Sequence, residues 1–224
     1  MADDNKPWKY ARYAIGEIVL VVIGILIALQ INTWNEERKN KKWEQQFLND
    51  LRNELQNDRQ QLTEVVEFQK TKKEASAEIM EILKVPNPSK KPLIDSLFHY
   101  IISGNRTFFP TSGVYDSGLS AGKIENLQND DLKYMIMNLY NHYYKRLVYN
   151  GEIYDQRVEK IAWERKEYFD KNAQKIRSWD QITSLKFYTH IEFLDTETGV
   201  YVTLADSNLQ EINNIIALIN NEIQ

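Results

Sequence analysis

The longest apolar run of the chain lies near its N-terminus, over residues 13–34. Residues 18–29 carry no polar side chain, and Glu17 and Gln30 stand near the two ends of the run. A helix rises about 1.5 Å per residue, so roughly 20 residues match a hydrocarbon core about 30 Å thick. Aromatic side chains flank the run on both sides, as is typical of the membrane interface. We therefore predict one transmembrane helix over residues 13–34.

The start of the chain also has features of a cleaved signal peptide, with Lys6, Lys9 and Arg12 ahead of an apolar stretch. However, the stretch is long and ends without a small-x-small cleavage site, which favours an uncleaved signal anchor. Four positive residues follow the span, at residues 38–42, and the N-terminal amine brings the preceding count to four as well, so the count of charges on the two sides is a tie. The N-terminal charges lie closer to the span, and a long following domain translocates regardless of charge. We expect a cytoplasmic tail (1–12), an inner-membrane span and an extracytoplasmic, periplasmic domain (35–224).

Five residues of the predicted span form one narrow face of the helix when placed at 100° per residue. This face consists of Ala14, Glu17, Val21, Gly24 and Ala28. Small residues such as Gly24 and Ala28, four apart, allow two helix backbones to approach closely. A membrane carboxylate usually faces a bundle interior, which favours self-association with Glu17 near the axis. The alternative is that Glu17, one turn from Tyr13, simply reaches the headgroup region.

The pattern after the span predicts helices almost throughout. No glycine or proline interrupts residues 35–85, and a heptad-like spacing there is apolar at seven of eleven positions. We interpret this as one helix that continues from the membrane to about Lys84, where Pro86 and Pro88 stop it. The heptad-like positions are Leu48, Leu51, Leu55, Asp58, Leu62, Val65, Gln69, Lys72, Ser76, Ile79 and Leu83.

Further helices are predicted over residues 93–102 and from Asn129, which caps a run that extends to Tyr168. Asn150 and Gly151 are a possible break in that run. Residues 105–113 read as a loop with apolar anchors. For residues 185–204 a helix competes with a hairpin, and we prefer the helix. The last helix, which ends with the chain, is expected to dock against the first long helix and close an antiparallel bundle.

Composition and motifs argue against several classes of function but do not identify one. The net charge of −4 gives no basic surface for nucleic acid, and the absence of cysteine excludes disulfides and thiolate chemistry. The three histidines are far apart, and the Gly118–Gly122 stretch lacks the spacing of a phosphate loop. The tripeptide Asn105-Arg106-Thr107 matches a glycosylation pattern that is too common to carry weight. We expect no enzyme activity, no cofactor and no metal.

The stretch Lys9–Glu36, KYARYAIGEIVLVVIGILIALQINTWNE, resembles the N-terminus of a family of uncharacterised single-span membrane proteins of Bacteroidota. A looser likeness covers residues 109–127, FPTSGVYDSGLSAGKIENL. The resemblance implies a bacterial envelope protein with an N-terminal anchor. It implies no activity, substrate or catalytic residue.

Together these features predict an all-α protein whose single span continues into a long helix and a helical bundle. The function we expect is that of a structural or interaction protein. Its expected partners are the lipid bilayer, further copies of the same chain bound through the span as a homo-oligomer, and other envelope proteins. Two alternatives stay open. The first is an oligomeric channel or transport subunit with Glu17 lining its axis. The second is a helical domain that senses a ligand.

Overall fold

The computed structural model describes residues 6–102, 104–165, 167–170 and 172–223. Residues 1–5 of the expected cytoplasmic tail therefore lie outside the described residues. The chain divides into an N-terminal unit, Met1–Leu48, and a C-terminal unit, Asn49–Gln224. Helix α1, Lys6–Lys84, supplies residues to both units. This agrees with the prediction that the apolar helix continues to Lys84.

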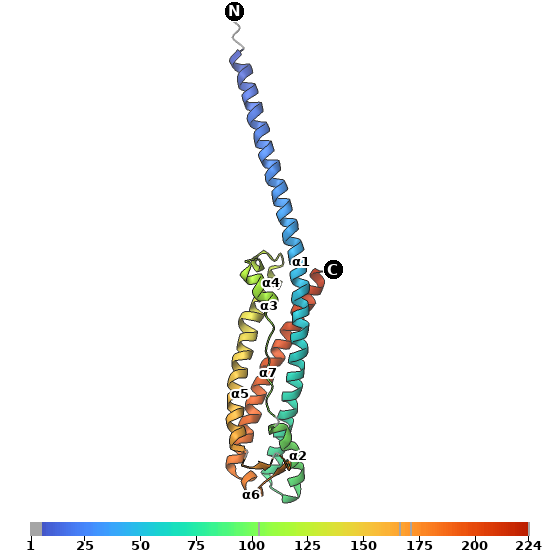
Figure 1. Ribbon diagram of the computed structural model, residues 1–224, viewed down its shortest axis with the longest axis vertical. Coiled ribbons are helices and arrows are strands. Elements are labelled where there is room, and N and C mark those ends of the chain that lie inside the picture. Colours follow the sequence, from blue (N-terminus) through green and yellow to red (C-terminus); the bar gives the residue numbers. More distant parts are fainter. Residues whose placement is uncertain (1–5, 103, 166, 171, 224) are drawn as a thin grey trace, which may run out of the picture. The chain divides into compact units, whose positions relative to one another are not determined.

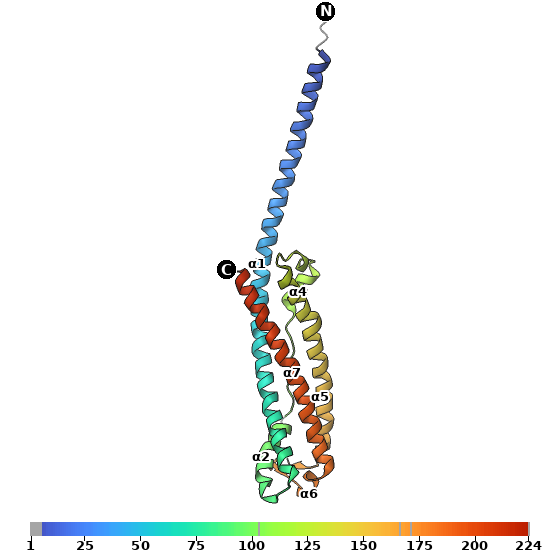
Figure 2. The same ribbon diagram turned by 180° about the vertical axis from the view of Figure 1, so that it is seen from behind.

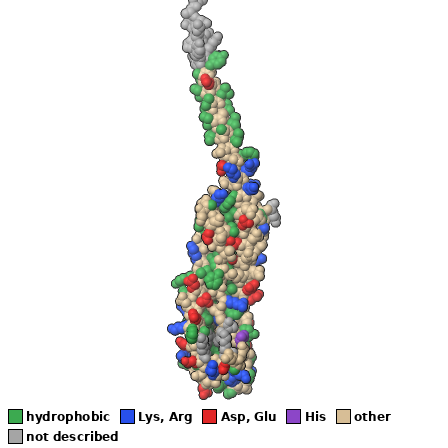
Figure 3. Space-filling model, viewed as in Figure 1, with side chains coloured by type: hydrophobic (Ala, Val, Ile, Leu, Met, Phe, Trp, Pro, Cys, Tyr) green, Lys and Arg blue, Asp and Glu red, His purple; other side chains and the backbone are tan. Residues whose placement is uncertain are grey.

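The N-terminal unit is the first part of α1, and its apolar side chains are exposed. Every residue from Arg12 to Trp34 is exposed, including eleven Ile, Leu or Val residues between Ile18 and Ile31. Figure 3 shows these hydrophobic side chains along the helix, followed by a group of Lys and Arg side chains. In length and composition, α1 qualifies as a candidate membrane span. No other helix of the described residues does.

The C-terminal unit is a helical bundle. It contains the rest of α1 and all the elements that follow it. They are η1 (Pro88–Lys90), α2 (Lys91–Ile102), α3 (Gly113–Ser120), η2 (Ile124–Asn126), α4 (Asp130–Asn138), the π-helix η3 (Leu139–Tyr144), α5 (Lys145–Arg165), β1 (Phe169–Asp170), β2 (Lys175–Ile176), α6 (Trp179–Ile182) and α7 (Leu185–Glu222). The all-α prediction is thus confirmed, apart from a two-stranded antiparallel sheet that pairs Phe169 with Ile176.

Helix α7 lies along both α1 and α5 (Figures 1 and 2). Its pairs with α1 include Arg52–Asn220, Lys70–Asp206 and Lys73–Asp195, so the numbers rise on one helix as they fall on the other. The two helices are therefore antiparallel, as expected for the last element. Helix α5 instead follows the direction of α1.

The heptad-like row of α1 faces the interior along its whole length. All eleven predicted positions from Leu48 to Leu83 are buried, the four polar ones included. Asp58, Gln69, Lys72 and Ser76 are at most 1% exposed. Polar groups at such depth are costly unless they find partners, so these positions require a structural explanation.

The helix expected from Asn129 to Tyr168 differs from the structure at three points. The helix expected to reach Tyr168 ends at Arg165, and the small β1–β2 sheet follows. It also continues through Asn150 and Gly151 without a break, because Gly151 is buried against Tyr201 and Thr107. The irregularity comes earlier, at the π-helix η3. Residues 185–204 belong entirely to α7, which confirms the helix and excludes the hairpin.

Residues 104–112 return the chain along the bundle without regular secondary structure, and we call them the crossing segment. Figures 1 and 2 show this stretch between α2 at one end of the bundle and α3 at the other. An extended chain advances about 3.3 Å per residue, more than twice the rise of a helix. The segment therefore spans the bundle with fewer residues than a returning helix would need. This return explains why α1 and α5 run in the same direction.

Candidate functional site

Five polar residues of α1 point toward the crossing segment from one side of the helix. They are Glu54, Asp58, Gln61, Gln69 and Lys72, separated by three, four or eight residues, as one helical face requires. An extended segment makes no hydrogen bonds within itself, so its backbone groups need other partners when it is covered by protein. The polar row of α1 supplies many of these partners.

The C-terminal half of the crossing segment and the start of α3 donate backbone hydrogen bonds to this row. The Thr111 amide donates to Asp58 at 3.0 Å, and the Val114 amide donates to Oε2 of Glu54 at 3.0 Å. The Phe109 amide donates to Gln61 at 3.0 Å. Because these donors belong to the main chain, the bonds fix the path of the segment rather than one side chain.

The N-terminal half is held through its carbonyl groups and through Asn105. The Gln69 amide donates to the Arg106 carbonyl oxygen at 2.5 Å and to Oδ1 of Asn105 at 2.9 Å. Lys72 donates to the same Oδ1 at 3.2 Å. Asn105 in turn donates to Asp155 of α5 at 2.6 Å. The side chain of the sequon asparagine is therefore engaged in the fold.

Tyrosines from α5 and α7 complete this network. The Phe108 amide donates to the Tyr201 hydroxyl at 2.8 Å, and the Tyr154 hydroxyl lies 3.0 Å from Oε1 of Gln69. The rings of Tyr154 and Tyr201 stack with centroids 5.4 Å apart. Burial raises the pKa of Tyr201 to about 12, so its hydroxyl stays protonated at neutral pH.

The π-helix η3 brings two tyrosines to the carboxylates of α1. Tyr140 donates to Oε1 of Glu54 at 3.1 Å, and Tyr144 donates to Oδ2 of Asp58 at 2.8 Å. In an α-helix residues four apart stand one above the other, and the wider π turn changes that register locally. Both rings also contact each other edge to face, with centroids 5.1 Å apart.

Burial dominates the ionisation of this cluster. It raises the pKa of Asp58 above its ordinary value, although the hydrogen bonds from the Thr111 amide and Tyr144 oppose the shift. The pKa values of Tyr140 and Tyr144 rise as well, first through burial and then through the neighbouring carboxylates Glu54 and Asp58. A deprotonated tyrosine is thereby excluded at neutral pH.

Glu54 and Asp58 have a structural role in the bundle. Each of their four carboxylate oxygens accepts a hydrogen bond from a backbone amide or a tyrosine hydroxyl. These bonds fix both carboxylates against the backbone of the crossing segment, the start of α3 and the tyrosines of η3. Within residues 6–223, apart from the few that are not described, no group of three His, Asp or Glu side chains is placed to hold a metal ion.

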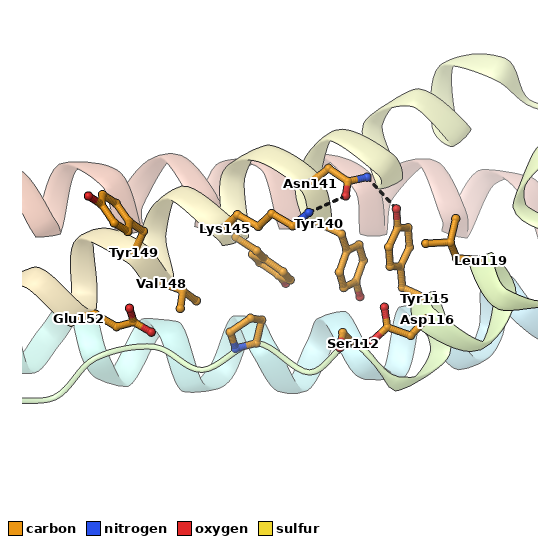
Figure 4. A pocket seen from close by; sticks show the side chains of 12 residues that line it. Ser112, Tyr115, Asp116, Leu119, Tyr140, Asn141, Lys145, Val148, Tyr149 and Glu152 are labelled. Atoms are coloured by element: carbon orange, nitrogen blue, oxygen red, sulfur yellow. Dashed lines mark hydrogen bonds between the residues drawn. The ribbon is translucent and has the colours of Figure 1, made fainter.

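Next to this cluster a groove of about 470 Å³ opens on the surface of the bundle. The crossing segment, α3, η3 and α5 all contribute to its walls (Figure 4). Tyr115 and Tyr140 stack in parallel with centroids 4.1 Å apart. The Tyr115 hydroxyl accepts a hydrogen bond from Asn141, whose carbonyl oxygen accepts one from Lys145. We call this hollow the aromatic groove.

The five residues predicted as a transmembrane interface lie on the exposed part of α1. Ala14, Glu17, Val21, Gly24 and Ala28 have no protein cover in the single chain. A shallow hollow of about 290 Å³ follows Ala14, Glu17 and Val21 along the helix. A Cβ added at Gly24 meets no atom within 4 Å. The face is thus accessible to a second helix, and its role as an interface stays a prediction.

The sequence had contained one signal for the buried polar network. Asp58, Gln69 and Lys72 interrupt an otherwise apolar row of α1, and the interruptions mark the places where the crossing segment is bound. Glu54 lies outside the heptad-like row, so the sequence pattern did not single it out. Its partner Tyr140 is one of several tyrosines on the same helix, and nothing in the sequence singles it out.

A family model matches residues 17–198, which is most of the chain. The chain belongs to DUF6090, a family of unknown function. The match begins at Glu17 and includes both the polar row of α1 and the aromatic groove. It therefore agrees with the expected membership of an uncharacterised family. No curated protein and no solved structure matches the chain.

Proposed function

We propose that this member of DUF6090 is a membrane-anchored structural or interaction protein of the bacterial envelope. The observation that carries the proposal is the exposure of apolar side chains over residues 12–34. Leaving so many Ile, Leu and Val side chains in water is unfavourable, since each costs about 1.5–3 kcal/mol relative to burial. A lipid bilayer removes that cost without any further protein.

The anchor is proposed to place its N-terminus in the cytoplasm and the bundle on the opposite side of the inner membrane. Support comes from the basic residues that immediately precede the span, together with the length of the domain that follows it. Cysteine substituted at the exposed Ser120 should react with a membrane-impermeant maleimide in intact spheroplasts. Labelling only after lysis would reverse the proposed orientation.

Self-association is proposed to occur through Ala14, Glu17, Val21, Gly24 and Ala28. Gly24 and Ala28 permit close approach, and packing rather than hydrophobicity drives helix association within lipid. Glu17 lies on the same face, where a partner helix would give its carboxyl a hydrogen-bonding neighbour.

We assign no catalytic step to the protein, because the buried carboxylates Glu54 and Asp58 are already engaged by the fold.

The mass of the full chain in lipid nanodiscs tests this proposal. Wild type should be a defined oligomer, and Gly24→Leu should dissociate it by filling the close approach between helices. Gly16→Leu is the matched control, because Gly16 is equally open but lies on a different side of the helix. A monomeric wild type, or equal disruption by both substitutions, would refute self-association through this face.

Two substitutions at the carboxylate sharpen the result. Glu17→Gln keeps a hydrogen-bonding group and should preserve the oligomer, whereas Glu17→Leu should weaken it. Ion conductance by the reconstituted wild type that Glu17→Gln alters would instead support the channel subunit. If Glu17→Leu does not change the oligomeric mass, the Glu17 carboxyl lies in the headgroup region and outside the interface.

A further inference from the structure

The aromatic groove has an apolar surface that the bundle itself does not cover. Leu119 of α3 is 49% exposed and Tyr149 of α5 is 63% exposed. Both line the groove, together with the half-buried Pro110 and Val148. Beneath them, Tyr140 and Tyr144 form a floor fixed by hydrogen bonds to α1. A preformed floor of this kind lowers the entropic cost of binding.

The charges around the aromatic groove are mainly negative. Asp116 and Glu152 lie toward opposite ends of it in Figure 4. Glu54 and Asp58 stand behind the floor, where they accept the hydroxyl groups of Tyr140 and Tyr144. Among the described residues that line the groove, Lys145 is the one cation, and it donates to Asn141. Such a surface attracts cations and repels phosphate or carboxylate ligands.

The length of the groove sets the size of an occupant. Asn141 and Glu152 are eleven residues apart on continuous helix, which corresponds to about 16 Å. An extended peptide covers that distance with about five residues. The groove is open to solvent along its length rather than closed around a small molecule, as its exposed lips Leu119 and Tyr149 indicate.

We propose that the aromatic groove binds an extended segment of a partner protein that carries basic residues on both sides of an apolar one. The apolar side chain lies over Val148 between Leu119 and Tyr149. The flanking Lys or Arg side chains reach Asp116 at one end and Glu152 at the other. This inference rests on the proposed function as an interaction protein, and it names the chemistry of the partner.

Selection from a random nine-residue peptide library, with the full chain in nanodiscs as the target, tests the inference. The selected peptides should be enriched in Lys and Arg around an apolar residue. Tyr149→Ser and Glu152→Lys should each weaken their binding at least about tenfold, as central contacts of an interface do. Tyr134→Ser and Glu159→Lys are matched controls at exposed sites outside the groove and should leave affinity unchanged.

Other outcomes would overturn the inference. These are selected peptides that are acidic, peptides whose binding ignores the groove substitutions, or a library that yields no binder at all. Binding of benzyltrimethylammonium in the groove without any peptide binder would assign it to a small organic cation instead. The mass of Tyr149→Ser should equal that of wild type, because the predicted oligomer interface lies in residues 14–28. Failure of the peptide selection is thereby distinguishable from failure of membrane anchoring or self-association.

Discussion

The two parts of α1 reverse the usual relation between polarity and exposure. Residues 12–34 expose apolar side chains, whereas the part from Asn49 onward buries polar ones such as Asp58, Gln69 and Lys72. The first part is not covered by the single chain, and we propose that lipid covers it. The second part has a specific partner, the crossing segment, whose backbone groups pair with the buried side chains. The exposed apolar residues are thus explained by the surroundings of the chain. The buried polar residues are explained by a contact within it.

Charging the first part should have the largest effect. The double substitution Ile23→Arg and Ile27→Arg places two charges near the centre of the predicted span, each costing about 2.5–3.5 kcal/mol on insertion scales. We expect the protein to leave the membrane fraction. Extraction with alkaline carbonate measures this, and the double substitution to leucine serves as the control. A charged variant that still resists extraction would show that residues 12–34 do not cross the bilayer.

Removing a buried polar group from the second part should destabilise the bundle instead. Asp58→Leu leaves the Thr111 amide and the Tyr144 hydroxyl without an acceptor, at a cost of about 2–4 kcal/mol in the free energy of unfolding. Asp58→Asn retains an acceptor and should stay within about 1 kcal/mol of wild type. Urea unfolding of the full chain in nanodiscs, followed by intrinsic fluorescence, measures both. Equal stability of the two variants would mean that the polar row does not hold the crossing segment.

Faster hydrogen exchange of the Thr111 amide in Asp58→Leu would locate the damage at the crossing segment. The same amide in Asp58→Asn should remain protected, because its acceptor is kept. General acceleration across α5 and α7 with no excess at Thr111 would contradict a local effect.

The sequence predicted those features that depend on local pattern. The α1 row, the stop after Lys84 and the Asn129 cap all follow from neighbours within a few residues. The Asn129 side chain accepts from the Leu132 amide, as a capping residue should. These features need no knowledge of the distant chain.

The sequence could not predict which distant segment pairs with the polar row. Thr111 and Asp58 are 53 residues apart, and a backbone amide leaves no mark in the sequence. The aromatic groove depends likewise on η3, whose π turn has no clear sequence signature. Asn150 and Gly151 suggested a helix break because glycine ends many helices. Tertiary packing overrides that preference here, since Gly151 lets α5 approach Tyr201 and Thr107 closely.

The close contact at Gly151 gives a smaller test of the second part. A Cβ at this position would stand 3.3 Å from the Tyr201 ring and 3.4 Å from Thr107 of the crossing segment. Gly151→Leu should therefore cost about 1–3 kcal/mol through overpacking. Gly199→Ala is the comparison, because its nearest neighbour is the flexible Lys73 side chain and the helix gains about 1 kcal/mol in propensity. If Gly151→Leu is as stable as wild type in the same urea experiment, close packing of the crossing segment on α5 is wrong.

The smallest expected effect is the pH dependence that Asp58 contributes. Burial raises the pKa of this carboxyl in the folded chain above the ordinary value of 3.8, so the folded state keeps its proton to a higher pH than the unfolded state does. As pH rises from about 3.8 through the raised pKa, the unfolded state therefore loses its proton first, and the free energy of unfolding falls. Asp58→Asn cannot titrate and should lack this component. The stability of wild type minus that of Asp58→Asn should decline with rising pH and then level off above the raised pKa. A difference that instead grows with pH would mean that the hydrogen bonds from the Thr111 amide and Tyr144 outweigh burial in setting the pKa of Asp58.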